Sequence, residues 1–481
     1  MVELQLRHRS PVSGLDRRRL GPLQVIAQSV SAVAPSAAMA TSPAMAAVTA
    51  GATVTWSYVI ATGLALLIGR CIAYFTRRMA VAGSLYSLTA KGLGPSAAFA
   101  CGCAMLVGYG VLGMGMLTGC AIYLGDLLAR LGVPRGPSTV AVAALGVLAL
   151  GALATVCTLR AVRLSAQVIL VVEAVSIGLM LVIFAVLLTG IGPHLDLRPF
   201  AISSANLGIV GAGVLPALGA FVGFEAAAAL GVEARRPFQT IPRAVQWTAG
   251  LAGVLFVAAT YTQVVGLSRL PGGLAGQGRP VTALATAQHL PWLSLLLDIG
   301  IAASFFACTL ATGTALTRVL FSMGRDGIAP HQFGATHPRH RTPRVAIMVA
   351  IPVTAAVPAV LLLAGMPAGV LLVTLINIAV FGYLVAYLLV CVSAPVFLRR
   401  IGELTVGAVL TAAVIAPVLV AVLVAFTMVT WNGPYPYAFG LLVLAALGWF
   451  GWLRLRRPAT LSGIGVYDET LAADVLGGTD R

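Results

Sequence analysis

A succession of apolar stretches, each long enough to cross a lipid bilayer, constrains this chain more than any other feature. Of its 481 residues, 59% are hydrophobic and only 9% are charged, whereas an ordinary soluble domain carries ~25% charged residues. About 20 apolar residues in a helix cross ~30 Å of hydrocarbon. Because lipid cannot pair with backbone amides and carbonyls, such segments are restricted to helices or closed barrels.

Twelve apolar stretches of this kind can be counted along the chain. They cover residues 23–49, 53–75, 97–124, 138–157, 166–189, 207–231, 245–266, 291–320, 345–364, 369–397, 405–430 and 437–453. The first is too long for a cleaved signal peptide, and a second follows it almost at once. We therefore predict an all-α polytopic membrane protein with twelve transmembrane helices.

The basic residues predict the orientation of these helices. An even number of spans places both tails on one face, and 25 of the 30 lysine and arginine residues then fall on that face. Basic loops stay on the cytoplasmic side, so we expect both termini in the cytoplasm and the protein in the cytoplasmic membrane. The net charge of +16 then reflects topology and attraction to anionic lipid, and we expect no nucleic-acid partner.

Glu225 lies in the middle of the sixth apolar stretch, where a charge is expensive. An ionisable group at bilayer depth costs at least ~2.5 kcal/mol, so such residues tend to line cavities or ion paths. The residues that weaken the helix in this stretch are Gly211, Gly213, Pro216, Gly219 and Gly223. Irregular backbone at that depth is tolerated only where it packs in protein or lines a cavity. A charge in a broken helix predicts a transport site.

The first stretch is also interrupted, at residues 34–37 (APSA), and it contains Pro43. Proline cannot donate an amide and displaces the carbonyl one turn earlier. In transporters built from inverted repeats, helices in corresponding positions of the two halves are broken near the midplane and bind substrate there. The sixth span is the counterpart of the first, so we predict that both are interrupted; an ordinary proline kink is the alternative for the first.

Three blocks of sequence resemble the amino acid-polyamine-organocation permease superfamily. Residues 221–225 (FVGFE) resemble its sixth-helix signature, residues 318–330 (RVLFSMGRDGIAP) its loop after helix 8, and residues 83–95, with GSLY and GLGP, its loop between helices 2 and 3. In the second block the signature positions are Arg318, Gly324, Arg325, Asp326, Gly327 and Pro330. The blocks follow one another in the order that the family has.

The resemblance implies a leucine-transporter-like architecture. Two inverted five-helix repeats would form a transport core over residues 21–398, with helices 11 and 12 appended over residues 399–457. Cytoplasmic tails would cover residues 1–20 and 458–481. The implied function is a secondary active transporter that moves an amino acid or related amine by alternating access, coupled to protons. An exchanger of amino acids or polyamines is the alternative.

The resemblance also implies substrate-binding residues at the two breaks. The family pattern Gly-Ser-Gly in helix 1, whose free amides hold the substrate carboxylate, reads here as residues 35–37. In helix 6 the relatives present backbone carbonyls to the substrate ammonium, and their aromatic gate falls near a glycine here. The predicted substrate-binding residues are Pro35, Ser36, Ala37, Tyr109, Gly219, Phe221, Val222 and Gly223. A packed core position is the alternative for the tyrosine, and the apolar lining favours a neutral amino acid.

Two glutamates are the candidates for coupling. Some relatives carry a lysine on helix 5, but the single lysine here, Lys91, lies in a loop. Glu173 on helix 5 and Glu225 lie inside spans; because burial favours a neutral carboxyl group, either could carry a proton. A structural role is the alternative for both. Sodium coupling would need oxygen ligands, for which Ser304 and Thr309 on helix 8 are candidates, although such hydroxyls often bond their own helix.

Other classes of function lack residue support. Neither a Walker-type phosphate loop nor the motif of a serine hydrolase or zinc protease occurs in the sequence, so energy would come from gradients. We expect no enzyme activity, no cofactor and no metal site. A sensor built on a permease scaffold would usually carry an added signalling domain, and the predicted tails leave no room for one.

Overall fold

The computed structural model describes residues 12–130, 132, 139–160, 163–191, 207–268, 270–287, 291–429, 431 and 433–465. The described residues form helices joined by turns and loops, and the β-structure found among them consists of two isolated bridges. The prediction of an all-α fold is therefore confirmed.

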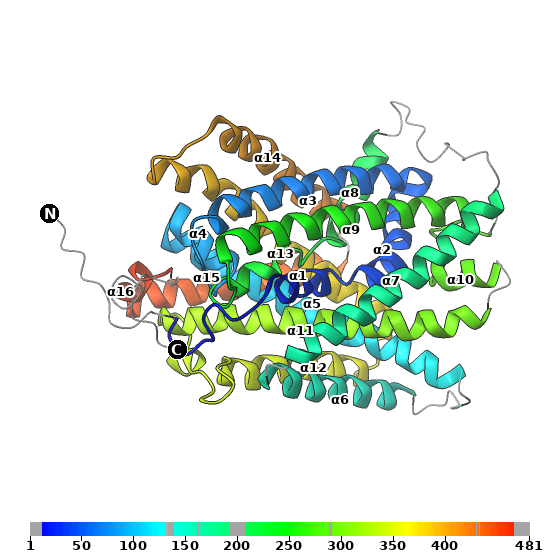
Figure 1. Cartoon of the computed structure of the whole chain (residues 1–481), viewed down its shortest axis with the longest axis horizontal. Coiled ribbons are helices and arrows are strands. Elements are labelled where there is room, and N and C mark those ends of the chain that lie inside the picture. The colour runs from blue at the N-terminus through cyan, green and yellow to red at the C-terminus, as the bar shows by residue number, and fades with distance from the viewer. Residues whose placement is uncertain are drawn as a thin grey trace.

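Helices of membrane length and several shorter ones make up the bundle (Figure 1). The long helices are α3 (Val54–Thr76), α5 (Pro95–Arg130), α6 (Thr139–Leu159), α7 (Arg163–Ile191), α9 (Pro237–Leu267), α11 (Pro291–Arg325), α12 (Arg344–Leu363), α13 (Ala368–Arg400), α14 (Val406–Val429) and α15 (Pro434–Arg456). The short ones are α1 (Pro22–Val33), α2 (Pro35–Ala50), α4 (Leu85–Leu93), α8 (Leu207–Gly219), α10 (Pro280–Ala287) and α16 (Pro458–Ser462), with 3₁₀ turns η1 (Gly51–Thr53), η4 (Ala226–Leu230) and η5 (His331–Gly334).

These helices fall on the predicted apolar stretches. Among the described residues, nine helical segments are long and apolar enough to cross a membrane, and one of them, Pro22–Thr76, contains the first two predicted spans. The exact count of twelve spans stays a prediction, as do the boundaries of the tails, the core and the appended helices.

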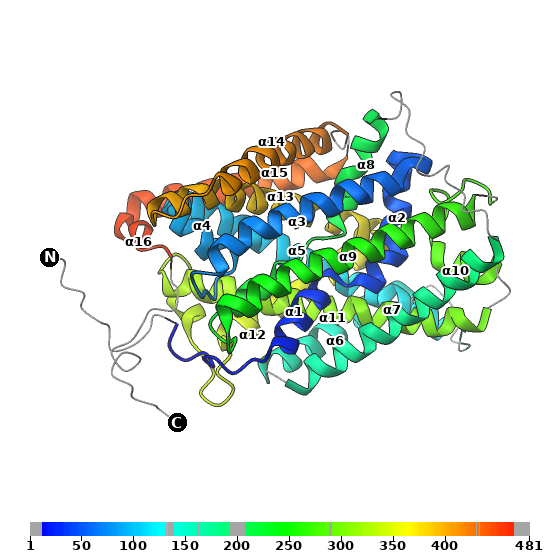
Figure 2. The same cartoon turned by 45° about the horizontal axis from the view of Figure 1, so that its top comes forward.

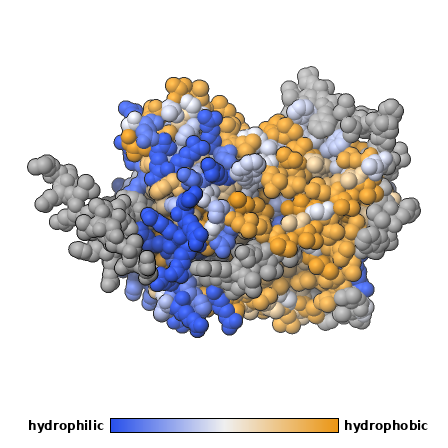
Figure 3. All heavy atoms as spheres, in the orientation of Figure 1, coloured by the Kyte–Doolittle hydropathy of each residue, from blue (hydrophilic) through white to orange (hydrophobic). Residues whose placement is uncertain are grey.

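Both described ends of the chain lie at the same end of the bundle (Figures 1 and 2). We call this the inner end and the opposite one the outer end. Figure 3 shows a hydrophilic band on the surface near the inner end and a largely apolar surface over the rest of the visible described face. An apolar surface beside a hydrophilic band is the surface expected of helices that stand in lipid.

Helices that the inverted repeat would relate to one another pack together in pairs. The second and seventh predicted spans, α3 and α9, lie against each other, as do α5 with α11 and α6 with α12. Small residues allow these close approaches. A Cβ added at Gly253 on α9 would lie 2.2 Å from Cγ2 of Thr62 on α3. The pairing fits the predicted arrangement of two interlocked halves.

Candidate functional site

The first predicted span is broken at Ala34, where α1 ends and α2 begins. Ala34 has φ +50° and ψ +62°, a left-handed conformation that turns the chain between the two helices. Its N–H donates to the carbonyls of Val30 and Ser31, the last turn of α1. Pro35 opens α2 and has no N–H, so the amides of Ser36 and Ala37 are the first of this helix that lack a partner within it.

The sixth predicted span is broken over residues 220–225, between α8 and η4. Gly223 has φ +100°, and a Cβ there would lie 2.5 Å from the carbonyl oxygen of Ala32 on α1. Ser29 on α1 donates to the carbonyl of Phe224 at 2.8 Å and accepts from the amide of Ala227 at 3.2 Å. The two interruptions therefore face each other, which confirms the prediction that helices 1 and 6 are broken.

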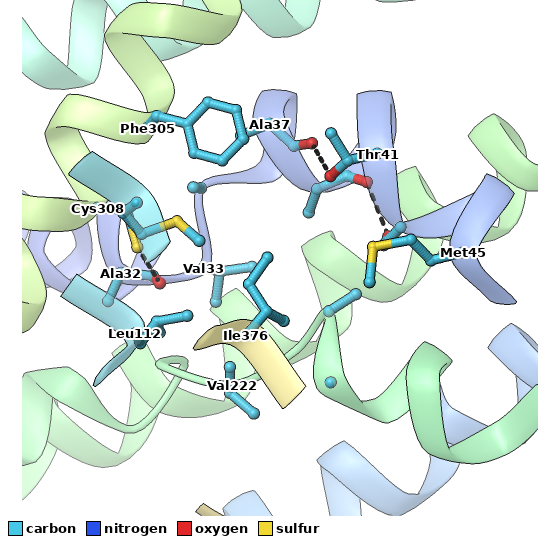
Figure 4. Close-up of a pocket in the computed structure, with 16 residues that line it drawn as sticks. Ala32, Val33, Ala37, Thr41, Met45, Leu112, Val222, Phe305, Cys308 and Ile376 are labelled. Atoms are coloured by element: carbon cyan, nitrogen blue, oxygen red, sulfur yellow. Dashed lines mark hydrogen bonds between the residues drawn. The ribbon is translucent and has the colours of Figure 1, made fainter. Parts of the chain in front are cut away.

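A cavity of about 60 Å³ lies between the two breaks (Figure 4). One water requires at least ~10–15 Å³, and a cavity of ~150 Å³ binds benzene, so this space holds a few waters and would have to widen to admit a larger solute. The first turn of α2 contributes Ala34 and Ala37, the second break contributes Val222, and α11 contributes Phe305 and Cys308.

The cavity lining is almost entirely apolar. Its two hydroxyl-bearing residues, Thr41 and Ser42, donate to the carbonyls of Ala37 and Ala38 in their own helix. Figure 4 shows the side chains of Val33, Leu112, Val222 and Ile376 close to one another around this space. A solute in the cavity would meet apolar side chains and the backbone of the two breaks.

Three of the eight predicted substrate-binding residues, Ala37, Gly219 and Val222, line this cavity. The other five, Pro35, Ser36, Tyr109, Phe221 and Gly223, are not among the lining residues. The ring of Phe221 packs edge-on against Phe256 at 5.0 Å. Binding by all eight residues stays a prediction.

Glu225 is fully buried beside the cavity and holds the second break together. Its Oε1 accepts from the hydroxyl of Tyr109 at 2.8 Å, and its Oε2 accepts from the hydroxyl of Tyr387 at 2.5 Å and from the amide of Gly223 at 3.2 Å. Tyr109 also lies 3.2 Å from the hydroxyl of Ser84. Tyr387 on α13 was absent from the predicted site.

Glu173 on α7 reaches the first break. Its Oε1 accepts from the amide of Ser36 at 2.9 Å, from the hydroxyl of Ser36 at 3.0 Å and from the hydroxyl of Ser304 at 3.0 Å. Ser304 in turn accepts from the amide of Ala37 at 3.3 Å. The structure thus brings Glu173 and Ser304 together, whereas Thr309 donates to Phe305 of its own helix. A sodium site at Ser304 and Thr309 stays a prediction.

The loop after α11 ties several elements together at the inner end. One guanidinium nitrogen of Arg318 lies 2.7 Å from both carboxylate oxygens of Glu233, which follows η4, and both side chains are buried. Asp326 accepts from the hydroxyl of Tyr86 and from the amide of Gly465. Burial is the larger cause and the charge of Asp326 the next one, and together they raise the pKa of Tyr86 well above its usual value. The phenol therefore keeps the proton that it donates.

The N-terminal segment joins the same assembly. The amide of Leu20 donates to the carbonyl of Glu233 at 2.8 Å, and the amide of Arg235 donates to the carbonyl of Leu20 at 2.9 Å. Arg325 donates to the carbonyls of Gly334 at 2.8 Å and Ser13 at 3.0 Å. At the inner end, the predicted loop signature therefore contacts three parts of the chain. These are the loop between helices 2 and 3, the segment after helix 6, and the N-terminal segment.

A profile of the family described as amino acid permease matches residues 20–453. The branched-chain amino acid permease BcaP of Bacillus subtilis is 26% identical over 305 residues, which cover 61% of this chain and 64% of that protein. The low-affinity putrescine importer PlaP of Escherichia coli is 29% identical over 383 residues, which cover 73% of this chain and 79% of that protein. The methylthioribose transporter of Bacillus subtilis is 25% identical over 295 residues, or 60% of this chain and 63% of that protein.

Among solved structures, a mutant of the manganese transporter of Eremococcus coleocola superposes with a TM-score of 0.51. The match covers 92% of this chain and 94% of that one at 16% sequence identity. This likeness concerns the fold alone, and it agrees with the predicted transporter architecture.

Proposed function

The chain belongs to the amino acid permease family, and on that premise we propose that it is a secondary active transporter of an amino acid or related amine. It would work by alternating access, in which one bundle of helices rocks against the rest around a fixed site. The family and its named relatives are permeases and transporters, so we propose no enzyme activity.

One observation carries this proposal: the two interrupted helices face each other around a small cavity. Gly223 of the second break lies against the carbonyl of Ala32, and Ala34, Ala37 and Val222 line the cavity between them. Broken helices release backbone groups from the helical hydrogen-bond pattern at that depth, and in transporters of this architecture such groups bind the polar groups of a solute. The apolar side chains would surround its hydrocarbon part.

The substrate class is supported by the family and by the cavity. One relative is named for branched-chain amino acids and another for putrescine, and the lining accepts an apolar chain of either kind. The alignment with the first covers 64% of that protein, so its substrate serves as a starting point for the assay.

Protons are the proposed coupling ion. Glu173 and Glu225 are buried carboxyl groups at the two breaks, and a change of protonation at either would alter the hydrogen bonds that hold its break. The excess of basic residues on the face with the tails supports cytoplasmic termini in a cytoplasmic membrane.

The test is uptake by the purified protein in liposomes. A panel of radiolabelled amino acids and amines would be assayed with and without an inward proton gradient, with protein-free liposomes as the control for passive entry. We expect uptake of at least one solute that the gradient stimulates. Uptake only into preloaded liposomes would indicate an exchanger, and transport of none of the solutes would overturn the proposed function.

A further inference from the structure

The N-terminus of α2 is the natural place for a carboxylate at this cavity. The first amides of a helix lack partners within the helix and carry partial positive charge, so they bind anions. Ala34 and Ala37, which flank this turn, line the cavity. No lysine or arginine occurs among the described residues that line it, so a bound carboxylate would depend on these amides.

These amides are already occupied by the protein's own side chains. The amide of Ser36 donates to Glu173 Oε1, and the amide of Ala37 donates to the hydroxyl of Ser304, which itself donates to Glu173. Glu173 is 1% exposed, so solvent does not compete for these bonds. The carboxylate comes from α7, far away in sequence, and takes the position at the helix end that a ligand's carboxylate would need.

A second carboxylate at this point would meet two obstacles. It would have to displace Glu173 from three hydrogen bonds, and it would bring a like charge beside it in a site that excludes water, where charges repel strongly. The Oε2 atom of Glu173 is buried and has no hydrogen-bond partner among the described residues. Glu173 is not among the residues that line the cavity. It would therefore act on a solute from behind the first turn of α2, where Oε2 can accept one more hydrogen bond.

We infer that the transported solute is an amine that lacks a carboxylate, and that Glu173 determines this specificity. The inference rests on the proposed transport function and narrows its substrate class. Glu173 fills the anion-binding turn of α2, and in its ionised form it places a negative charge behind the residues that line the cavity. An ammonium group matches this charge, and the carboxylate of an amino acid opposes it.

The experiment compares amines with the amino acids that differ from them by one carboxylate. Uptake of radiolabelled putrescine and ornithine, and of 3-methylbutylamine and leucine, is measured in proteoliposomes against protein-free liposomes. We expect the parent protein to take up each amine at least ~10-fold faster than its amino acid. Because this ratio needs no variant, it tests the inference even if every substitution at Glu173 prevents folding.

Two variants distinguish a role of Glu173 in substrate specificity from a purely structural role. Glu173→Gln keeps the shape and an acceptor for Ser36 but removes the charge, and we expect the amine-to-amino-acid ratio to fall by ~10-fold. Glu225→Gln, the matched removal of the other buried carboxylate, should change the uptake of both members of a pair together and leave their ratio unaltered. If the role of Glu173 were purely structural, Glu173→Gln would lower the uptake of the amine and of its amino acid equally.

The possible failures are distinguishable. If the parent protein takes up leucine or ornithine as fast as the matching amine, the inference about Glu173 is wrong while the transport function stands. If it takes up none of the panel solutes, the transport function fails and this inference fails with it.

Discussion

At the scale of single residues, Glu225 accepts three hydrogen bonds that hold the second break, as Glu173 does at the first. Three donors from three parts of the chain, Tyr109, Tyr387 and the amide of Gly223, share its two oxygens. Such a network stabilises the fold while every donor has its acceptor. Each buried donor that loses its acceptor costs ~1–3 kcal/mol of stability.

Replacing Glu225 with glutamine should both weaken the fold and change the pH response. The amide NH₂ cannot accept a hydrogen bond, so at least one of the three donors has to find another acceptor, and we expect the melting temperature of the purified protein to fall. If Glu225 carries the proton, uptake by this variant also loses its dependence on external pH, because glutamine does not ionise.

Tyr383→Phe is the matched control. Its buried hydroxyl has no partner among the described residues, so its loss should leave the melting temperature near that of the parent. Proton linkage through either glutamate would be abandoned if Glu225→Gln and Glu173→Gln both kept the pH profile of the parent.

The sequence identifies Glu225 and Glu173 because each is a charge inside an apolar stretch, a local signal. Their partners could not be predicted, since Tyr387 lies 162 positions from Glu225 and Ser36 lies 137 positions from Glu173. Tyr383 and Tyr387 are one helical turn apart on α13, and this spacing of two polar aromatics in a membrane span is the signal that could have indicated Tyr387.

At the scale of elements, the site depends on the contact between the two broken helices. Gly223 permits this contact for two reasons: its φ of +100° disfavours any side chain, and the carbonyl oxygen of Ala32 occupies the position that a Cβ would take. Ser29 then bonds to Phe224 within the second break and to Ala227 just after it.

Gly223→Ala should therefore disrupt the site. The left-handed conformation alone costs ~1–3 kcal/mol, and a Cβ 2.5 Å from the Ala32 oxygen forces the breaks apart. We expect a lower melting temperature and a loss of uptake. Gly211→Ala on α8 is the control, because nothing lies within 4 Å of an added Cβ there. Equal stability of the two variants would contradict the proposed contact.

The positions of the breaks were predictable because proline and glycine act locally. The predicted first stretch, 23–49, corresponds to α1 and α2 (Pro22–Ala50), and the sixth, 207–231, to α8 and η4. Which residues line the cavity was not predictable in the same way. Ser36 and Phe221 lie at the two breaks but are not among the residues that line the cavity, because the exact rotation of a helix turn decides which side chains face the space.

At the scale of the whole molecule, ion pairs hold both ends of the bundle. Arg318 and Glu233 pair at the inner end. At the outer end Arg279 pairs with Asp126, and Arg130 with Asp298 at 3.2 Å. The cavity lies between these two clusters, and alternating access would require each to open in turn.

The central claim is that the space between the two breaks is the path of the solute, and filling it is the most direct test. Val222 is 4% exposed and lines the cavity, whereas Val254 on α9 is 69% exposed. Uptake of the best panel solute would be measured for Val222→Trp and Val254→Trp, each first shown by its melting temperature to be folded. We predict that Val222→Trp loses at least ~10-fold in uptake while Val254→Trp keeps the parent rate. Parent-like uptake by a folded Val222→Trp protein would contradict the account.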